Sequence, residues 1–314
     1  MHQIWVMRAY KQRITNSSSY NNSLKQRGRL DFWIDKSIFS NWTYKGKQSK
    51  GGKVVYSDIA IEMALILSYV YNLPLRQTEG FLSSILQLNK LQLTTPDYTT
   101  LCRRKRTLDV RNKLKKWNRK DNIVFAIDGS GLKCQGEKEW IQSQYRTARR
   151  RKFIKIHAGI NINTRHVLFN KATTSRVSDI SVLSEAIDDV DVKFDTLFAD
   201  GGYDSKSSYK LTHPDTKVII PPRSNAVKDK HTHQRNQYIN YINEHSKSRW
   251  KREYNYHQRA LVENSFSRWK TIFGENIKSK NEIAQQTEVT LKSIILNKMT
   301  DIGMPEWKNI YYLR

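Results

Sequence analysis

The chain has 314 residues, and its 55 Lys and Arg residues outnumber the 29 Asp and Glu residues to give a formal net charge of +26. Apolar residues make up 38% of the sequence, which is enough for a packed core and excludes a charge-dominated disordered chain. No apolar stretch reaches the roughly 18 residues of a membrane span, so we expect neither a transmembrane segment nor a signal peptide. The positive charge instead indicates a polyanionic partner, with nucleic acid as the first candidate.

Cysteine content and charge distribution narrow this further. Only Cys102 and Cys134 are present, which excludes a disulfide framework and a cysteine-rich zinc site. This fits the reducing cytoplasm, where we expect the protein to associate with the nucleoid. Residues 1–120 carry a net charge of +16 and the rest of the chain carries +10. The amino-terminal part is therefore the first place to look for DNA binding.

The first elements in chain order are an arm and a glycine-containing linker, expected over residues 1–52, and then helices. Ser57 is placed to cap a helix whose apolar residues recur at helical spacing. A second helix is expected over 75–86. A third is expected from Thr95, because a proline follows at the first helical position and an acid in the first turn. We expect a helical domain over 53–120.

The third helix has a polar start and a basic end. This outline suits the recognition helix of a helix-turn-helix, which puts its first turns into the major groove. The residues expected to contact DNA there are Thr99, Thr100, Arg103, Arg104, Lys105 and Arg106. A small helical bundle with no DNA-binding role has the same outline and stays open as the alternative.

Two short apolar runs, 123–127 and 197–199, each lead into an Asp-Gly pair, at Asp128 and at Asp200. Each run predicts a buried strand with an aspartate at its carboxyl end, which is the edge where open α/β sheets hold their ligands. A single Asp-Gly is more often a turn, but two in the same context favour a site. Further strands are expected over 153–162, 167–173 and 218–220.

Residues 256–273 predict a helix with a polar face. Tyr256, Arg259, Glu263 and Lys270 fall within an arc of roughly 60° at helical spacing. A neighbouring apolar stripe can pack inward and turn these four side chains to a cleft. The alternative is an ordinary surface ion pair between Arg259 and Glu263, of little consequence. The acidic residues of 179–195, in contrast, are expected on an exposed helix and its turn.

Asp128, Asp200 and Glu263 together supply the carboxylate oxygens that two hard divalent cations prefer. Two such ions activate the attacking oxygen and stabilise the leaving oxygen of a phosphodiester. We therefore expect two Mg²⁺ ions, with Mn²⁺ as a substitute, and phosphoryl-transfer chemistry on DNA.

These residues resemble the motifs of bacterial insertion-sequence DDE transposases that carry the Y-R-E-K signature, the IS-four/IS-five superfamily. Tyr256, Arg259, Glu263 and Lys270 match that signature in order and spacing. Residues 200–204 resemble the second-aspartate motif of the family, and residues 128–133 resemble the first. The framing stretches 73–80, 96–101, 220–223 and 303–305 also look like the family. Gly129 is a mild departure, because many relatives have a hydroxyl residue there.

The resemblance implies an α/β ribonuclease H-like catalytic core, a mixed sheet with flanking helices, over 121–300, with a tail over 301–314. It implies that Asp128, Asp200 and Glu263 hold the two Mg²⁺ ions. Tyr256, Arg259 and Lys270 would contact the transposon end.

The resemblance also implies an activity on double-stranded DNA. The enzyme would cleave at terminal inverted repeats and then join the freed 3′ hydroxyl to target DNA, as a homodimer or higher oligomer on paired ends. Two alternatives stay open: a DNA-binding regulator without catalysis, and a two-metal DNA nuclease or resolvase on the same fold.

Overall fold

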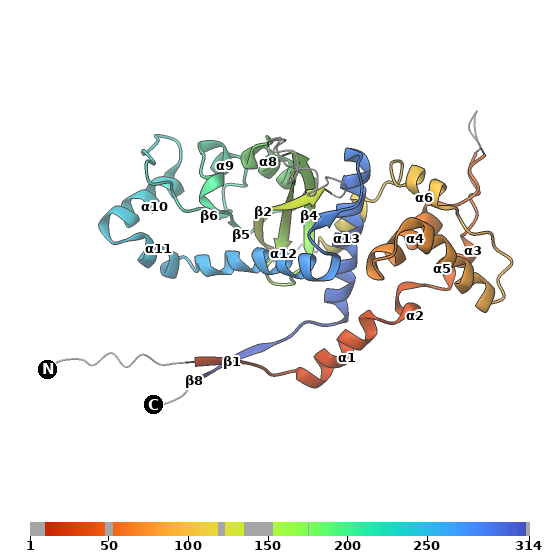
Figure 1. Ribbon diagram of the computed structural model, residues 1–314. Helices are drawn as coiled ribbons and strands as arrows, with labels where there is room; N and C mark the ends of the chain where they lie inside the picture. Colours follow the sequence, from red (N-terminus) through yellow and green to blue (C-terminus); the bar gives the residue numbers. More distant parts are fainter. Residues whose placement is uncertain (1–9, 48–52, 119–122, 135–152, 175, 312–314) are drawn as a thin grey trace, which may run out of the picture.

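A computed structural model describes residues 10–47, 53–118, 123–134, 153–174 and 176–311 (Figure 1). Its centre is a mixed sheet in which the spatial order is β4-β3-β2-β5-β6. β2 runs antiparallel to β3, β3 runs antiparallel to β4, and β5 and β6 run parallel to β2. This arrangement is consistent with a ribonuclease H-like core. The strands are β2 (Val124–Cys134), β3 (Phe153–Asn161), β4 (Val167–Thr174), β5 (Thr196–Phe198) and β6 (Lys217–Ile219), and β7 (Asn276–Ile277) pairs with the far end of β2.

The strands expected from the sequence are confirmed, with one correction at β2. The structure does not end this strand at Asp128, because pairing with β3 continues as far as Lys133. Only the parallel pairing with β5 stops early, at Ala126 opposite Phe198. Asp128 is therefore inside a long strand, at the point where its neighbour on one side ends.

The expected amino-terminal helices are also present, as α4 (Asp58–Val70), α5 (Leu75–Leu88) and α6 (Tyr98–Arg104). Ser57 caps α4 as expected, since its side chain accepts a hydrogen bond from the Ala60 amide. The expected start of α6 at Thr95 is wrong. Asp97 is the capping residue, because its carboxylate accepts from the amides of Thr99 and Thr100. The helix ends at Arg104.

The helix expected over 256–273 is divided in two. A 3₁₀ turn, η3 (Tyr256–Arg259), follows Asn255 in the left-handed region and leads into α12 (Ala260–Phe273). The remaining helices are α1 (Ser17–Arg27), α2 (Leu30–Trp33), α3 (Ser37–Ser40), η1 (Arg111–Trp117), α8 (Asp179–Val190), η2 (Gly201–Tyr203), α9 (Lys206–Lys210), α10 (His233–Glu244), α11 (Lys247–Glu253) and α13 (Glu282–Ile302).

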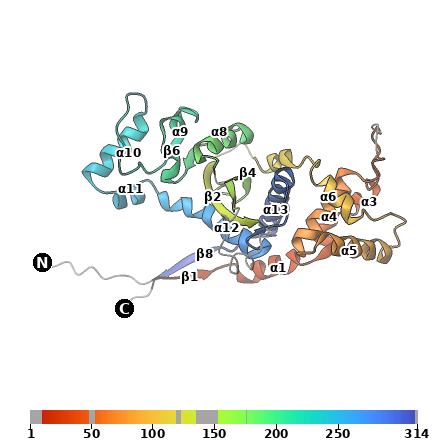
Figure 2. The same ribbon diagram turned by 45° about the horizontal axis from the view of Figure 1, so that its top comes forward.

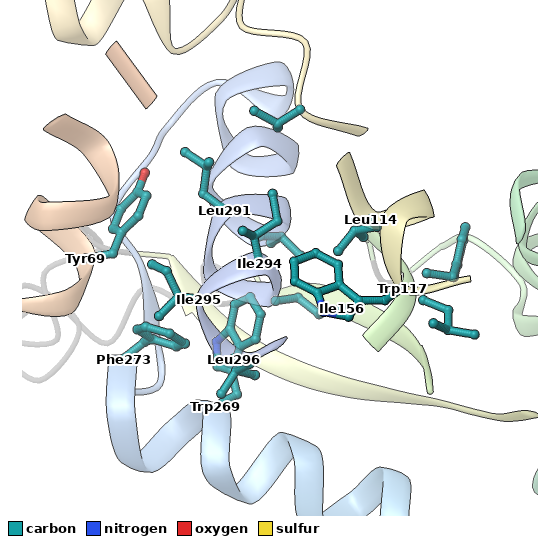
Figure 3. Packing of buried hydrophobic residues seen from close by; sticks show 14 of the residues in the cluster. Tyr69, Leu114, Trp117, Ile156, Trp269, Phe273, Leu291, Ile294, Ile295 and Leu296 are labelled. Carbon is teal, nitrogen blue, oxygen red and sulfur yellow. The ribbon is translucent and has the colours of Figure 1, made fainter. Parts of the chain in front are cut away.

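α13 is the central support of the core. It contacts α4 on one side and β4 and η1 on another, and α12 also packs against it. Figure 3 shows Leu291, Ile294 and Ile295 of α13 among side chains from these elements. The apolar core is therefore continuous from the amino-terminal helices to the sheet. Figures 1 and 2 also show a ribbon of β1 (Tyr10–Ile14) and β8 (Trp307–Tyr311) that extends away from this body.

No single helix in the described part of the chain is both long and apolar enough to cross a membrane. The pair α4 and α5 has the required length and composition only when taken together, and it is bent by 112°.

Candidate active site

The sheet register places the two aspartates at the same level. The last parallel pair between β2 and β5 joins Ala126 to Phe198, and Asp128 and Asp200 each stand two residues further on. Because β2 and β5 run side by side in the same direction, the two aspartates stand next to each other at the point where β5 ends. Asp200 then begins η2, where its Oδ1 accepts a hydrogen bond of 2.8 Å from the Gly202 amide.

Asp128 is half-buried, and burial raises the pKa of its carboxyl. Two contacts oppose this by favouring the charged form: the Gly129 amide donates to Oδ1 at 2.8 Å, and Arg259 supplies a positive charge. The negative charge of Asp200 acts on Asp128 in the other direction and raises its pKa further. Two carboxylates that repel each other in a partly buried site favour the binding of cations.

Arg259 joins Asp128 to the third expected acid. Its Nη1 donates to Asp128 Oδ2 at 2.8 Å, and its Nη2 donates to Glu263 Oε1. Glu263 lies in the first turn of α12 with a side chain that is 52% exposed, so it stands at the solvent edge of the site. The ion pair between Arg259 and Glu263, which the sequence left open as the alternative, is present, and the same guanidinium also contacts Asp128.

The other two signature residues have different surroundings. Tyr256 is only 9% exposed and packs against Trp250, and its hydroxyl donates to the Ala199 carbonyl at 3.3 Å. It therefore supports the end of β5 directly before Asp200. Lys270 is half-buried near the end of α12, and within the described ranges its side chain forms no ion pair or hydrogen bond. Contact of either residue with DNA stays a prediction.

The residues expected to read DNA on α6 fall into three groups. Lys105 is only 7% exposed and its Nζ donates to Ser279 Oγ at 3.1 Å, so it faces the α13 side of the molecule. Arg104 donates to the Tyr56 carbonyl and pairs with Asp58. Arg103 and Arg106 are exposed, and the hydroxyls of Thr99 and Thr100 both bond to the Asp97 carboxylate.

One acid near the site was not singled out by the sequence. Asp179 was expected on an exposed helix face, but at the start of α8 its side chain is only 26% exposed. It pairs with Lys155 and lies 3.5 Å from His157 Nδ1. A Cβ built on Gly202 would stand 2.9 Å from Asp200 Oδ1 and 3.5 Å from Asp179 Oδ2. Glycine is needed there, and nothing in the local sequence of Asp179 marks this proximity.

No group of three or more His, Cys, Asp or Glu side chains in the described ranges is gathered closely enough to hold a metal ion as it stands. In the candidate site, the guanidinium of Arg259 forms ion pairs with both Asp128 and Glu263. The donor type nevertheless fits magnesium, since all three acids offer carboxylate oxygens.

Comparison with known families identifies the family of the chain. The family described as "Transposase DDE domain" matches residues 98–298, and a second family of the same description matches residues 25–137. The first match covers more than half of the chain. The chain belongs to the DDE transposase family, and it is an enzyme.

Two solved structures are remotely similar to this chain. One is a piggyBac transposase synaptic complex with hairpin DNA, with 11% identity and a TM-score of 0.40 over 92% of this chain and 78% of that chain. The other is a Drosophila P element transposase strand transfer complex, with 13% identity and a TM-score of 0.29 over 88% of this chain and 70% of that chain.

Proposed function

We propose that this transposase belongs to the Y-R-E-K insertion-sequence group, binds terminal inverted repeats, cleaves at the ends and joins 3′ hydroxyls to target DNA. The observation that carries the proposal is that Asp128 and Asp200 each stand two residues beyond the last residue pair of the neighbouring parallel strands β2 and β5, and that Arg259 joins Asp128 to Glu263. Two-metal phosphoryl transfer needs carboxylates from separate parts of the chain in one place, and the position of these three acids supports that mechanism.

Asp128, Asp200 and Glu263 are the residues that would hold two Mg²⁺ ions, or Mn²⁺ in their place. When bound, such ions activate the attacking oxygen and stabilise the leaving oxygen of the phosphodiester. The Gly202 amide fixes the Asp200 carboxylate, and Tyr256 fixes the backbone before it. Both contacts hold a ligand in position before DNA arrives, which limits the cost of organising the site.

Arg259 has two roles in this proposal. Without DNA it forms ion pairs with Asp128 and Glu263, which hold these two side chains close together. The planar guanidinium of Arg259 would also be suited to bind a phosphate of the transposon end with two parallel hydrogen bonds. Lys270, on the same helix, would add a second contact to the backbone of the transposon end.

The DNA partner is double-stranded and is bound over a wide basic surface, which the net charge of +26 supports. The helices α4–α6 would read the terminal repeat in helix-turn-helix manner, with two exposed cations, Arg103 on α6 and Arg106 just beyond its end. We propose a homodimer or higher oligomer, because two ends have to be joined to one target.

The experiment is Mg²⁺-dependent nicking and strand transfer with a labelled end substrate. Asp128→Ala, Asp200→Ala and Glu263→Ala should each lose at least about 10³-fold in both steps, and double variants should lose little more, since the three acids act as a unit. Binding to terminal DNA should survive. Near-normal nicking by Glu263→Ala would show that the third ligand is wrongly assigned.

The matched control is Asp188→Ala, an exposed acid on α8 for which normal activity is expected. Asp204 is less suitable, although it is close to Asp200. Its carboxylate is fully buried and pairs with Arg235 at 2.7 Å, so its removal damages the fold. Strand transfer with ends that are already cut separates a transposase from a nuclease of the same fold, because only the transposase joins them.

A further inference from the structure

A cavity of about 650 Å³ lies outside the carboxylate site, between the amino-terminal helices and the start of α13. Its walls come from the end of α4, the start of α5, α6, and the segment that joins β7 to α13. The volume is within the range of about 300–1,000 Å³ that is usual for small-molecule sites. Neither Asp128, Asp200 nor Glu263 lines it.

The lining of this cavity combines apolar walls with a positive rim. Leu73, Pro74 and Ala284 are among the apolar residues, and no acidic residue is among the lining residues. Four cations line it: Lys105, Arg106, Lys278 and Lys280. The first and third are engaged with protein, with Ser279 and Asn72 respectively. Arg106 and Lys280 are exposed, and in the described part of the chain their side chains form no ion pair or hydrogen bond.

One residue that lines the cavity, Tyr69, also carries a buried polar atom. Tyr69 is only 3% exposed, and its hydroxyl has no hydrogen-bond partner among the described residues. In Figure 3 this hydroxyl is turned away from the apolar side chains of Ile295 and Phe273. A buried hydroxyl without a partner costs free energy, and a ligand with an acceptor atom would remove that cost.

We propose that this cavity binds a nucleotide, with the base between the apolar walls and the Tyr69 hydroxyl and the phosphate at Arg106 and Lys280. An inorganic anion would leave the apolar walls uncovered, and an apolar ligand would leave the cations unused. The nucleotide is either free in solution or an unpaired nucleotide of bound DNA, and the second source rests on the proposed function. In that case the cavity holds a displaced base while the carboxylates act elsewhere on the DNA.

The cavity contains its own reporter, because Cys102 is an exposed free thiol in its lining. The experiment measures the rate at which iodoacetamide alkylates Cys102 in the full chain, with peptide mass spectrometry to separate it from Cys134. The probes are deoxynucleoside monophosphates, inorganic phosphate, a fully paired duplex end, and the same duplex with one unpaired nucleotide.

We expect a free monophosphate to slow alkylation at least about fivefold and inorganic phosphate to have no effect, as a site with both apolar and charged contacts predicts. Protection by the duplex with the unpaired nucleotide, and not by the paired one, would assign the site to bound DNA and support the proposal equally. Equal protection by phosphate alone, or protection by none of the probes, would overturn it.

Three variants test the named contacts. Tyr69→Phe removes only the hydroxyl and should weaken the affinity about fivefold, the loss expected for one net hydrogen bond. Arg106→Ala and Lys280→Ala should each weaken it about tenfold, because contacts to a charged phosphate are stronger. Lys210→Ala, an exposed lysine on α9 with no part in the cavity, should leave it unchanged. Unchanged affinity in Tyr69→Phe together with Arg106→Ala would overturn the assignment.

This test is independent of the catalytic proposal. Asp128→Ala should lose nicking and keep nucleotide protection of Cys102. Loss of protection in the cavity variants, with normal strand transfer of a precut end, would show the reverse separation.

Discussion

Replacement of Arg259 by alanine should strengthen metal binding in the absence of DNA. The Arg259 and Asp128 side chains are 18% and 16% exposed, and 2.8 Å separates their bonded atoms. Two unit charges about 4 Å apart attract by about 4 kcal/mol at an effective dielectric constant of about 20. Desolvation reduces this to the net value of about 2 kcal/mol that is typical of a charge-assisted hydrogen bond. The more exposed Glu263 pair adds less than about 1 kcal/mol.

A cation that binds to wild type has to displace this guanidinium, whereas in Arg259→Ala it does not. The difference of about 2 kcal/mol corresponds to an affinity for Mn²⁺ about thirtyfold higher in the variant. Calorimetric titration of DNA-free protein measures it directly. Lys270→Ala is the matched control, because it removes one positive charge from α12, the helix that follows Arg259, and Lys270 has no ion pair with Asp128. The Mn²⁺ affinity of this variant should change by less than about threefold.

The same variant should lose activity on DNA, because the guanidinium is no longer present to bind a phosphate. Higher metal affinity with lower nicking is therefore the expected combination. If Arg259→Ala kept its fold by circular dichroism and bound Mn²⁺ as weakly as wild type or more weakly, the competition between Arg259 and cations would be refuted.

Two further predictions concern stability. Burial lowers the pKa of His157 to about 4. Below pH 6.5 the imidazole is therefore protonated in the unfolded chain but stays neutral in the folded chain. Because of this difference, the free energy of unfolding falls as the pH drops towards 4. Urea unfolding at pH 7 and pH 5 should show about 2 kcal/mol more loss in wild type than in His157→Gln, and equal losses would contradict this. Glu288→Ala removes the acceptor of Lys292 and of the Ser279 amide and hydroxyl inside the core. Calorimetry should show that the free energy of unfolding of Glu288→Ala is lower by about 3–5 kcal/mol, which is about 6 °C in Tm. The double variant Glu288→Leu with Lys292→Met should lose less stability, because neither member of the pair is then left as an unpaired buried charge. A loss below about 1 kcal/mol in Glu288→Ala would be inconsistent with a buried ion pair.

The sequence predicts the strands and the order of the acids because these depend on local patterns. Short apolar runs bounded by turns identify β5 and β6, and the family resemblance identifies Glu263 on α12. The position of Asp128 inside its strand could not be predicted in this way. It depends on how far β3 continues to pair with β2 after β5 has ended. The lengths of these two neighbouring strands, and not the local sequence around Asp128, decide this.

In the basic run that begins on α6, helical spacing shows which cations are buried, and a count of charges does not. Lys105 follows Leu101 by four residues, so at helical spacing it points to the same side as a fully buried residue. Arg104 is likewise engaged with Tyr56 and Asp58. The proximity of Asp179 to Asp200 had no comparable signal, because it arises only when α8 packs next to η2. A run of positive charge indicates an anionic partner such as DNA. Helical spacing then indicates which of these cations are exposed and available to bind it.

The central position of α13 has a consequence for how the protein is made. α6 ends at Arg104 and α13 begins at Glu282, so at about 5–20 residues per second the ribosome takes roughly 10–35 s to produce the segment between them. During this time the side of α4 that carries Tyr69 has no α13 to pack against. The helix α4 is therefore synthesised early and keeps an apolar face exposed until α13 follows. A pause in translation before residue 282 would prolong this stage, in which the chain is most prone to aggregate.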